Sequence, residues 1–160
     1  MLSSSASSHH NYPEIIWNSQ SKSICLVFKD AIPTQFQMVA HHVHLIRHAQ
    51  GHHNLTPLNH NMPDPTLTTL GLSQCYALGN SFPYTPLITH IVASPLRRTL
   101  YTALESFPTL VQPPRSLKVI ALPEIQETSD LPCDTGSALE LLQKEFGPGG
   151  AGEKWEGCVD

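Results

Sequence analysis

Short β-prone runs alternate with stretches of helical periodicity in this sequence, and that alternation constrains the fold more than any other feature. Three runs are expected to be strands: His42–Ile46, Leu87–Ala93 and Leu117–Leu122. Three helices are expected as well: from a Thr68 cap to about Ser81, from Pro95 onward with Leu96, Leu100, Leu104 and Phe107 on one face, and from a Ser137/Glu140 capping box to about Phe146. Strands that alternate with helices indicate an α/β domain with a mostly parallel sheet.

The first 37 residues differ in composition from the rest. They begin with a Ser/His-rich stretch and continue with scattered apolar residues that are interrupted by Pro13 and Pro33. We expect residues 1–37 to be a disordered N-terminal extension with one short strand at Ile24–Phe28. Residues 38–160 are expected to form one domain, because a chain of 160 residues with 40% hydrophobic content supplies one core rather than two.

Charge and cysteine content narrow the classes of partner. Nine Lys and Arg against 13 Asp and Glu give a net charge of −4 without a basic stripe, which argues against a nucleic-acid binder and leaves room for a small anionic ligand. No apolar stretch approaches the roughly 20 residues that a membrane span needs. The four cysteines form no CxxC pair. Reduced thiols and a soluble cytoplasmic protein are therefore expected, with no membrane partner.

Two expected strands each lead into a polar segment that carries arginine. Arg47 and His48 follow the first of them, and Arg98 lies four residues after Ser94, where the second has ended. Ligands of α/β sheets bind beyond the carboxyl ends of the strands. A neutral imidazole can attack phosphorus, and guanidinium groups can bind phosphate oxygens in bidentate fashion. Arg47, His48 and Arg98 are therefore candidate phosphate-site residues.

Three further residues are candidates for the same chemistry. Asn54 lies six residues beyond His48 and offers an amide donor from the loop. A carboxylic acid is needed to protonate a leaving alkoxide, and Glu124 and Glu127 follow the third expected strand. These residues alone leave both glutamates as candidate acids.

Four ordered segments resemble motifs of the histidine phosphatase superfamily, also called the phosphoglycerate mutase-like superfamily. Residues 45–54 (LIRHAQGHHN) resemble its opening Arg-His-Gly motif with a downstream Asn, and residues 64–74 (DPTLTTLGLSQ) its Leu-Thr-x-x-Gly-x-x-Gln segment. Residues 94–103 (SPLRRTLYTA) are similar to its Ser-Pro-Leu-x-Arg-x-x-Gln-Thr-Ala segment, with Tyr101 where Gln is usual. Residues 122–137 (LPEIQETSDLPCDTGS) look like the variant of fungal members. Four motifs in order make the resemblance specific.

The resemblance implies a phosphoglycerate mutase-like fold with three α/β/α layers, and it implies a role for each candidate. Those roles are a phosphohistidine at His48, phosphate binding by Arg47, Asn54 and Arg98, and an acid at Glu127 with Glu124 as the alternative. No metal and no organic cofactor is implied. The expected partner is a small phosphorylated substrate, a phosphomonoester that is hydrolysed, or phosphate itself.

The sequence departs from the family pattern in two places. Ala49 stands where the first motif has Gly. Members carry a second pocket histidine at the end of a late strand beside the first one, whereas the last histidine here is His90 and the sequence ends at Asp160. The resemblance therefore implies a domain that is incomplete on its C-terminal side, with one edge of a central strand unpaired and with reduced stability.

Other interpretations compete with a phosphatase. The chain could be a non-catalytic phosphate-binding or interaction remnant that retains Arg47, His48 and Arg98. It could also be an incomplete reading frame whose natural start is Met38. Phosphoglycerate mutase activity is a weaker interpretation than hydrolysis, because retention of a phosphoryl group requires a more enclosed pocket.

Several nearby residues have simpler expected roles. The histidines around the first motif, including His52, His53 and His60, are expected to be incidental surface or loop residues rather than metal ligands. Arg97 falls on a different helix face from Arg98 and is expected to be solvated. Asp130 and Asp134 would either orient the acid loop or form ordinary turns.

Overall fold

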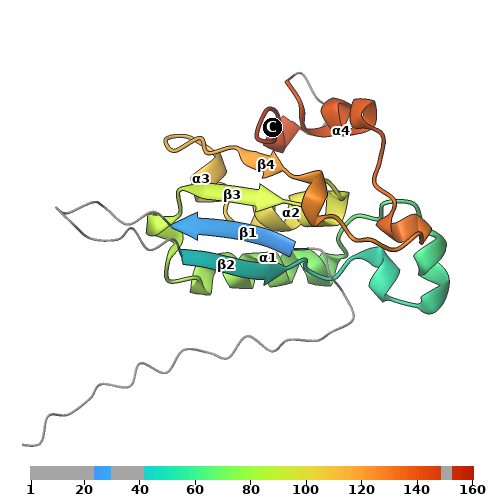
Figure 1. Ribbon diagram of the computed structural model, residues 1–160. Coiled ribbons are helices and arrows are strands. Elements are labelled where there is room, and N and C mark those ends of the chain that lie inside the picture. The colour runs from blue at the N-terminus through green and yellow to red at the C-terminus, as the bar shows by residue number, and fades with distance from the viewer. Residues whose placement is uncertain (1–23, 30–41, 149–152) are drawn as a thin grey trace, which may run out of the picture.

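A four-stranded mixed sheet forms the centre of the computed structural model, which describes residues 24–29, 42–148 and 153–160 (Figure 1). Its strand order is β2-β1-β3-β4. The strands are β1 (Ile24–Lys29), β2 (His42–Arg47), β3 (His90–Ala93) and β4 (Val119–Ala121). β1 is antiparallel to both of its neighbours, and β3 is parallel to β4. The expected mostly parallel sheet is therefore wrong for the two pairings of β1. β2, β3 and β4 nevertheless share one direction, so their carboxyl ends meet at one edge of the sheet.

β1 occupies the position between the two strands that lead into the arginines. The strand predicted near Ile24–Phe28 is confirmed, and its register runs from Ile24 opposite Arg47 to Lys29 opposite His42. Its other edge pairs with β3. β1 thus pairs with the edge of β2 that lies toward β3, while β2 is the outermost strand and its other edge has no partner strand among the described residues. The sheet also includes residues on both sides of the domain boundary expected at residue 38, while the rest of the expected extension lies outside the described residues.

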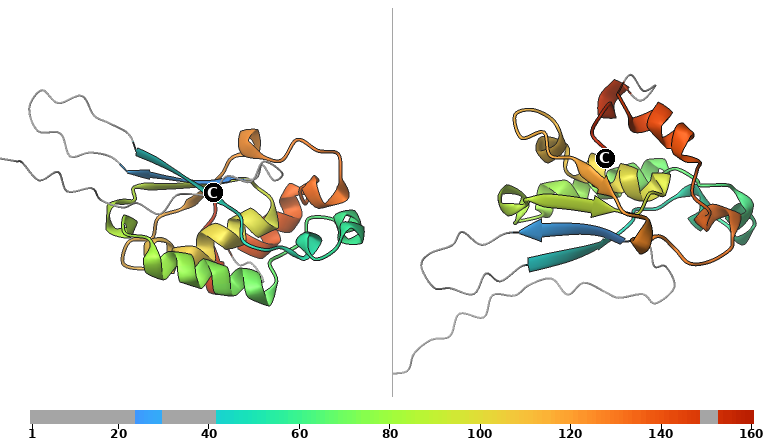
Figure 2. Two further views of the ribbon diagram at one scale, coloured as in Figure 1. Left: turned by 90° about the horizontal axis from the view of Figure 1, so that it is seen from below. Right: turned by 45° about the horizontal axis from the view of Figure 1, so that its top comes forward.

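Helices α1 (Thr69–Ser81), α2 (Arg97–Ser106) and α3 (Pro108–Val111) lie on one face of the sheet (Figure 2). The core between helices and sheet includes Ile88, Ile91, Ala93, Leu100, Ala103, Leu104, Phe107 and Val119. On the other face, Val43 and Leu45 of β2 remain 49% and 43% exposed. The described part of the chain therefore forms two layers, where three were expected.

Local sequence accounts for where two helices begin. Thr68 caps α1 as predicted, since its hydroxyl oxygen accepts a hydrogen bond from the Gly71 N–H at 3.0 Å. α2 begins at Arg97 rather than at Pro95, and the predicted inner residues Leu96, Leu100 and Leu104 are all fully buried. The apolar spacing thus fixes which face of α2 meets the core.

The predicted capping box of the last long helix is wrong. α4 (Leu139–Phe146) has Ala138 at its N-cap without a side-chain hydrogen bond. The Ser137 hydroxyl instead donates to the Asp64 carboxylate at 2.7 Å. A tertiary contact has therefore taken the side chain that a local cap would have used.

The final residues lie along the outer edge of β4. The Val119 N–H donates to the Cys158 carbonyl oxygen at 2.8 Å, and the Ala121 N–H to the Asp160 carbonyl oxygen at 2.7 Å. Phe146 and Trp155 of the preceding segment are buried in the core. Short 3-10 helices complete the described elements: η1 (His52–Asn54), η2 (Pro57–Asn61), η3 (Thr85–Leu87), η4 (Pro123–Ile125), η5 (Pro132–Asp134) and η6 (Glu153–Trp155).

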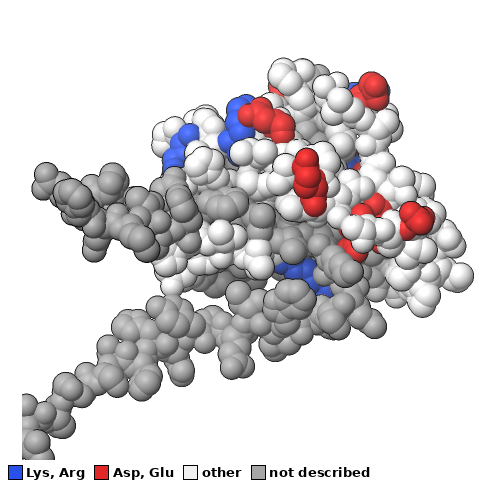
Figure 3. Space-filling view, in the orientation of Figure 1, with Lys and Arg blue, Asp and Glu red and all other residues white. Residues whose placement is uncertain are grey.

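Surface charge and helix length bear on the class of partner. On the face in Figure 3, the basic side chains of the described residues form no continuous patch, and the acidic ones are scattered among uncharged residues. Within the described ranges, no helix has both the length and the apolarity that a membrane crossing needs. Cys75, Cys133 and Cys158 are free thiols, as predicted.

Candidate active site

The segment after β2 is hydrogen-bonded to α1 and to α2. The Ala49 N–H donates to the Thr102 hydroxyl oxygen of α2 at 3.0 Å. The Gln50 N–H donates to the Gln74 side-chain oxygen of α1 at 2.8 Å. These contacts fix the backbone of the two residues that follow His48, so His48 is held at the carboxyl end of β2.

Gly71 makes this close approach possible. A Cβ at residue 71 would lie 2.2 Å from the Gln50 carbonyl oxygen, far inside van der Waals contact. The same carbonyl accepts a hydrogen bond from the Thr68 N–H at 3.0 Å. The glycine at the start of α1 thus sets how closely the His48 segment packs on the helix.

His48 is buried, and its environment holds it in one neutral form. Its side chain is only 5% exposed, and its Nδ1 lies 2.7 Å from the Ala49 carbonyl oxygen. A carbonyl oxygen can only accept, so Nδ1 carries the proton and the lone pair is on Nε2. Burial lowers the pKa of His48 to about 3, assisted by the charge of Arg98 and opposed by the hydrogen bond to Ala49. At neutral pH the imidazole is therefore uncharged and nucleophilic.

Arg98 is the most buried charged residue near His48. It is 1% exposed on α2, and its guanidinium donates to the Asp134 carboxylate at 2.7 Å and to the Cys133 carbonyl oxygen at 2.5 Å. Its charge contributes to the lowered pKa of both His48 and His53. The structure thus brings the second predicted arginine to the predicted histidine, with an internal carboxylate as its partner.

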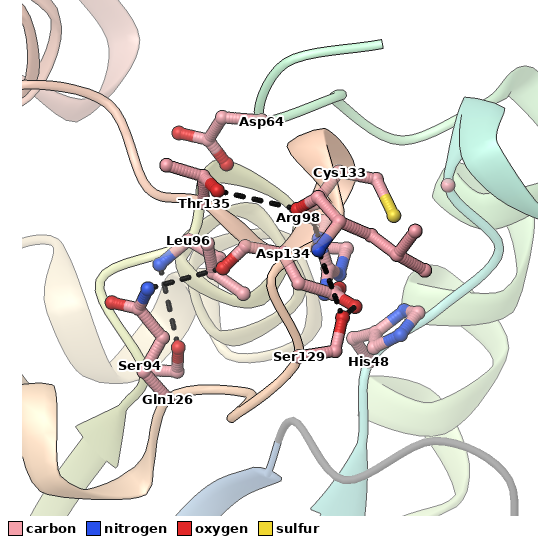
Figure 4. Close-up of polar contacts among 12 residues, drawn as sticks. His48, Asp64, Ser94, Leu96, Arg98, Gln126, Ser129, Cys133, Asp134 and Thr135 are labelled. Atoms are coloured by element: carbon pink, nitrogen blue, oxygen red, sulfur yellow. Dashed lines mark hydrogen bonds and ion pairs between the residues drawn. The ribbon is translucent and has the colours of Figure 1, made fainter. Parts of the chain in front are cut away.

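The loop that supplies this carboxylate is itself organised by hydrogen bonds. The Ser129 hydroxyl donates to the Asp134 carboxylate at 2.6 Å, and the Gln126 side-chain amide donates to the Asp134 carbonyl oxygen at 3.1 Å. Figure 4 shows Asp134 and Ser129 together with Arg98 and His48. Sequence reasoning left Asp134 as a loop-orienting residue or a turn residue. Its pairing with Arg98 depends on how the loop after β4 folds back onto α2, which spacing does not reveal.

Asp64 is a second carboxylate that sequence reasoning did not assign. It is almost fully buried, accepts from the Arg97 N–H at the start of α2 at 2.9 Å, and accepts from the Ser137 N–H at 3.0 Å. Its backbone φ of 37° lies in the left-handed region, which Asp tolerates better than most residues. Asp64 therefore ties the loop after β2 to α2 and to the loop that carries Asp134.

Arg97 corrects another prediction. It was expected to be solvated, but its guanidinium pairs with both Glu145 carboxylate oxygens of α4, at 2.8 and 2.9 Å. The Tyr101 hydroxyl donates to the same carboxylate at 2.5 Å. Tyr101, which stands where the family segment has Gln, therefore contributes to the attachment of α4 to α2.

The remaining predicted residues lie around this centre. Arg47 is exposed at the end of β2, and its charge helps to lower the pKa of His48. Asn54 is exposed in η1, and its side-chain oxygen accepts from the Gly51 N–H at 3.0 Å. Glu127 is half-buried in the loop after η4, and Glu124 is exposed within η4. The geometry thus groups His48, Arg47 and Arg98 but adds no distance that would choose between the two glutamates.

Sequence reasoning assigned one nearby histidine to the wrong class. His53 was expected to be an incidental loop residue, but its side chain is 5% exposed and its ring centroid lies 5.3 Å from that of His48. Hydrophobic periodicity carries no signal for the burial of a polar side chain in a loop. The first-motif segment therefore places two imidazoles together.

A cavity of about 210 Å³ lies beside the end of β2. It is lined by Arg47, His48, Ala49, Gln74, Cys75, Leu78, Thr102 and Ser106. Burial raises the pKa of the Cys75 thiol on its wall, so that thiol is protonated at neutral pH. A larger cavity of about 450 Å³ lies near the C-terminal residues, away from His48, and includes Lys118 and Lys154. We take the smaller cavity as part of the site because it contains the predicted histidine and arginine.

One of three comparisons with known proteins gave a match. The family model described as histidine phosphatase superfamily (branch 1) matches residues 43–132, which include β2 from its second residue onward, α1, β3, α2, β4 and every predicted site residue. Searches of curated proteins and of solved structures gave no significant match. The match spans more than half of the 160 residues and contains the buried His48 with its neighbouring arginines. The chain therefore belongs to the histidine phosphatase superfamily, branch 1.

Proposed function

We propose that the protein is a phosphatase that hydrolyses a phosphomonoester through a phosphohistidine on His48. The observation that carries this proposal is the state of His48: it is buried, its pKa is lowered to about 3, and its Nδ1 is fixed by the Ala49 carbonyl. An imidazole held in this way presents a lone pair on Nε2 at neutral pH. The guanidinium groups of Arg47 and Arg98 provide positive charge for a phosphoryl group.

The proposed reaction has two steps. In the first, Nε2 of His48 attacks phosphorus, an N–P bond forms, and the P–O bond to the alcohol breaks. Glu127, with Glu124 as the alternative, gives its proton to the leaving alkoxide. In the second, water attacks phosphorus, the carboxylate accepts a proton from that water, the N–P bond to His48 breaks, and phosphate leaves. Arg47, Arg98 and Asn54 hold the phosphoryl oxygens, and no metal or organic cofactor takes part.

Hydrolysis of a generic aryl phosphate tests this proposal. His48→Ala should lower the rate by about 10³-fold or more, because residues of such a site act as a unit. His52→Ala is a matched control in the same loop and should leave the rate within about twofold. Equal rates for the wild type and His48→Ala would contradict the proposal. Trapping of a base-stable, acid-labile phosphoenzyme would identify the intermediate.

A second candidate function is phosphate binding without turnover. It is favoured by the Arg98–Asp134 ion pair, because the guanidinium already has an anionic partner that a phosphoryl group must share or displace. Thermal stabilisation by inorganic phosphate, with no product from any phosphomonoester, would support this alternative. Mutase activity is the weaker proposal, since the cavity beside His48 is open to solvent.

The remaining features of the proposal concern partners and origin. We propose a small phosphorylated molecule as the partner, no nucleic acid or membrane, and a cytoplasmic location, which the free thiols support and imaging of a tagged protein would test. The likeness of residues 122–137 to fungal members stays a prediction, as do an incomplete C-terminal side and an incomplete reading frame.

A further inference from the structure

His53 is a buried polar side chain whose surroundings leave a hydrogen-bonding atom without a partner. Its Nδ1 has no hydrogen bond within the described part of the chain. Nearly all buried polar groups in proteins are paired, and an unpaired one costs about 1–3 kcal/mol. A buried imidazole in this state, next to a candidate nucleophile, is an arrangement that a bound ligand would complete.

The space that His53 occupies is formed by a specific glycine. Gly51 has φ −95° and ψ 164°, an extended conformation that any residue can adopt. A Cβ at this position would lie 2.7 Å from Nδ1 of His53 and 2.8 Å from Cε1. Glycine is therefore needed for room rather than for backbone conformation. It allows the His53 ring to fold back beside His48, where the two centroids are 5.3 Å apart and the planes are tilted by 51°.

The charges around His53 favour an anion. Burial lowers its pKa to about 4, with contributions from Arg98, His60 and Arg47 that Asp134 opposes. The ring is therefore neutral at pH 7, and a neutral imidazole donates one N–H. Two of the groups that act on it, Arg98 and Arg47, also act on His48. An anion bound by these arginines at His48 would lie within the field that surrounds His53.

We propose that His53 is a second phosphate-binding histidine of this site, whose N–H donates to an oxygen of the phosphoryl group that His48 attacks. The assignment rests on the proposed function for the identity of that group. It gives a binding role to a residue that sequence analysis treated as incidental, and it supplies a second pocket imidazole from the same loop as the nucleophile.

Equilibrium binding of inorganic phosphate, measured by calorimetry, tests the assignment without turnover. His53→Phe should weaken binding at least tenfold, which is about 1.4 kcal/mol. His53→Gln, which keeps an N–H donor, should recover part of the loss. Gly51→Ala keeps the imidazole but occupies its space, so it should also weaken binding. His52→Gln is the matched control and should bind phosphate within twofold of the wild type.

A measurement on the wild type avoids any variant that fails to fold. In proton and nitrogen NMR, the His53 ring should titrate near pH 4 in the free protein. Saturating phosphate should raise that pKa, because a bound anion stabilises the protonated ring. An unmoved His53 titration, together with unaltered phosphate affinity in His53→Phe and His53→Gln, would overturn the assignment.

The outcomes separate this assignment from the phosphatase proposal. Phosphate binding that depends on His53, in a protein that hydrolyses no phosphomonoester, would contradict the phosphatase proposal alone. Hydrolysis that depends on His48, with phosphate binding indifferent to His53, would contradict this assignment alone. A wild type that neither binds phosphate nor hydrolyses a phosphomonoester would contradict both.

Discussion

Arg97 and Arg98 are adjacent at the start of α2 but serve different parts of the molecule. The Arg97 side chain is 32% exposed and pairs with Glu145 of α4. The Arg98 side chain is 1% exposed and pairs with Asp134 beside His48. One helical step of about 100° separates a surface attachment from a buried charge. The two residues share their type and are neighbours in the sequence, so the face of α2 on which each lies determines its environment.

The two ion pairs should differ in how much they matter for stability. The Arg97–Glu145 pair is partly exposed, so solvent screens its charges and its contribution should lie near the roughly 0–1 kcal/mol of a surface pair. Breaking a buried pair by removal of one partner costs about 3–5 kcal/mol, because the other charge stays buried without compensation. Arg98 therefore requires an anion at all times, which Asp134 supplies in the structure and a phosphoryl group would supply in the proposed reaction.

Loss of the Asp134 charge should give the largest effect. Asp134→Asn removes the carboxylate charge that pairs with the buried Arg98 guanidinium and should lower the free energy of unfolding by about 3–5 kcal/mol. Urea denaturation measures this. Inorganic phosphate should stabilise Asp134→Asn more than the wild type, because phosphate can then replace the missing carboxylate.

The matched control replaces both partners. Arg98→Met combined with Asp134→Leu removes both charges and should recover most of the stability that Asp134→Asn loses. This double variant should lack phosphatase activity, because it lacks the Arg98 guanidinium. A stability of Asp134→Asn within 1 kcal/mol of the wild type would show that Arg98 is not effectively buried, and the contrast with Arg97 would disappear.

Acid should lower the free energy of unfolding through the two buried imidazoles near Arg98, those of His48 and His53. The pKa values of His48 and His53 are lowered to about 3 and about 4 in the folded protein. At a pH between the ordinary histidine pKa of about 6.5 and these lowered pKa values, the unfolded chain binds more protons than the folded protein. Stability therefore falls as pH falls from about 6.5 toward 4. Each imidazole contributes a slope of up to about 1.4 kcal/mol per pH unit. Denaturation curves at pH 7, 6, 5 and 4 should show a shallower slope for His53→Gln; an unchanged slope would mean that His53 is not buried.

Loss of the Arg97 partner should give the smallest effect. Glu145→Gln keeps a hydrogen-bond acceptor for Tyr101 and should lower the free energy of unfolding by no more than about 1 kcal/mol. High salt should reduce even this difference, because exposed charges are screened. Aryl phosphate hydrolysis should stay within about twofold of the wild type. A cost comparable to that of Asp134→Asn would contradict the contrast between the two arginines.

Sequence patterns predicted the parts of the fold that interactions between nearby residues determine. The Thr68 cap and the spacing of Leu96, Leu100 and Leu104 gave two helices and their inner faces. Direction and neighbours of β1 were not predictable, because a strand has the same side-chain period whichever way it runs. Pairing partners are decided by the whole sheet.

The candidate site divides in the same way. Arg47, His48 and Arg98 were predicted because each follows an expected strand, and strand ends converge. Asp134, Asp64 and His53 were missed in their structural roles. Their partners lie on other elements, and no spacing in the sequence records how a loop folds back. The family match spans residues 43–132 and says nothing of the contacts that Asp134, Asp64 and His53 make.

β1 also determines the distance between the two strand ends, at Arg47 and Ala93, from which the site residues extend. It is hydrogen-bonded on one edge to the strand that ends at Arg47 and on the other to the strand that ends at Ala93. Neighbouring strands are about 4.8 Å apart, so β1 holds the carboxyl ends of β2 and β3 about 10 Å from each other. A chain that began at Met38 would lack this spacer. Its two strand ends could then approach by one strand width, and the spacing between His48 after β2 and the Arg98 helix after β3 would change with them.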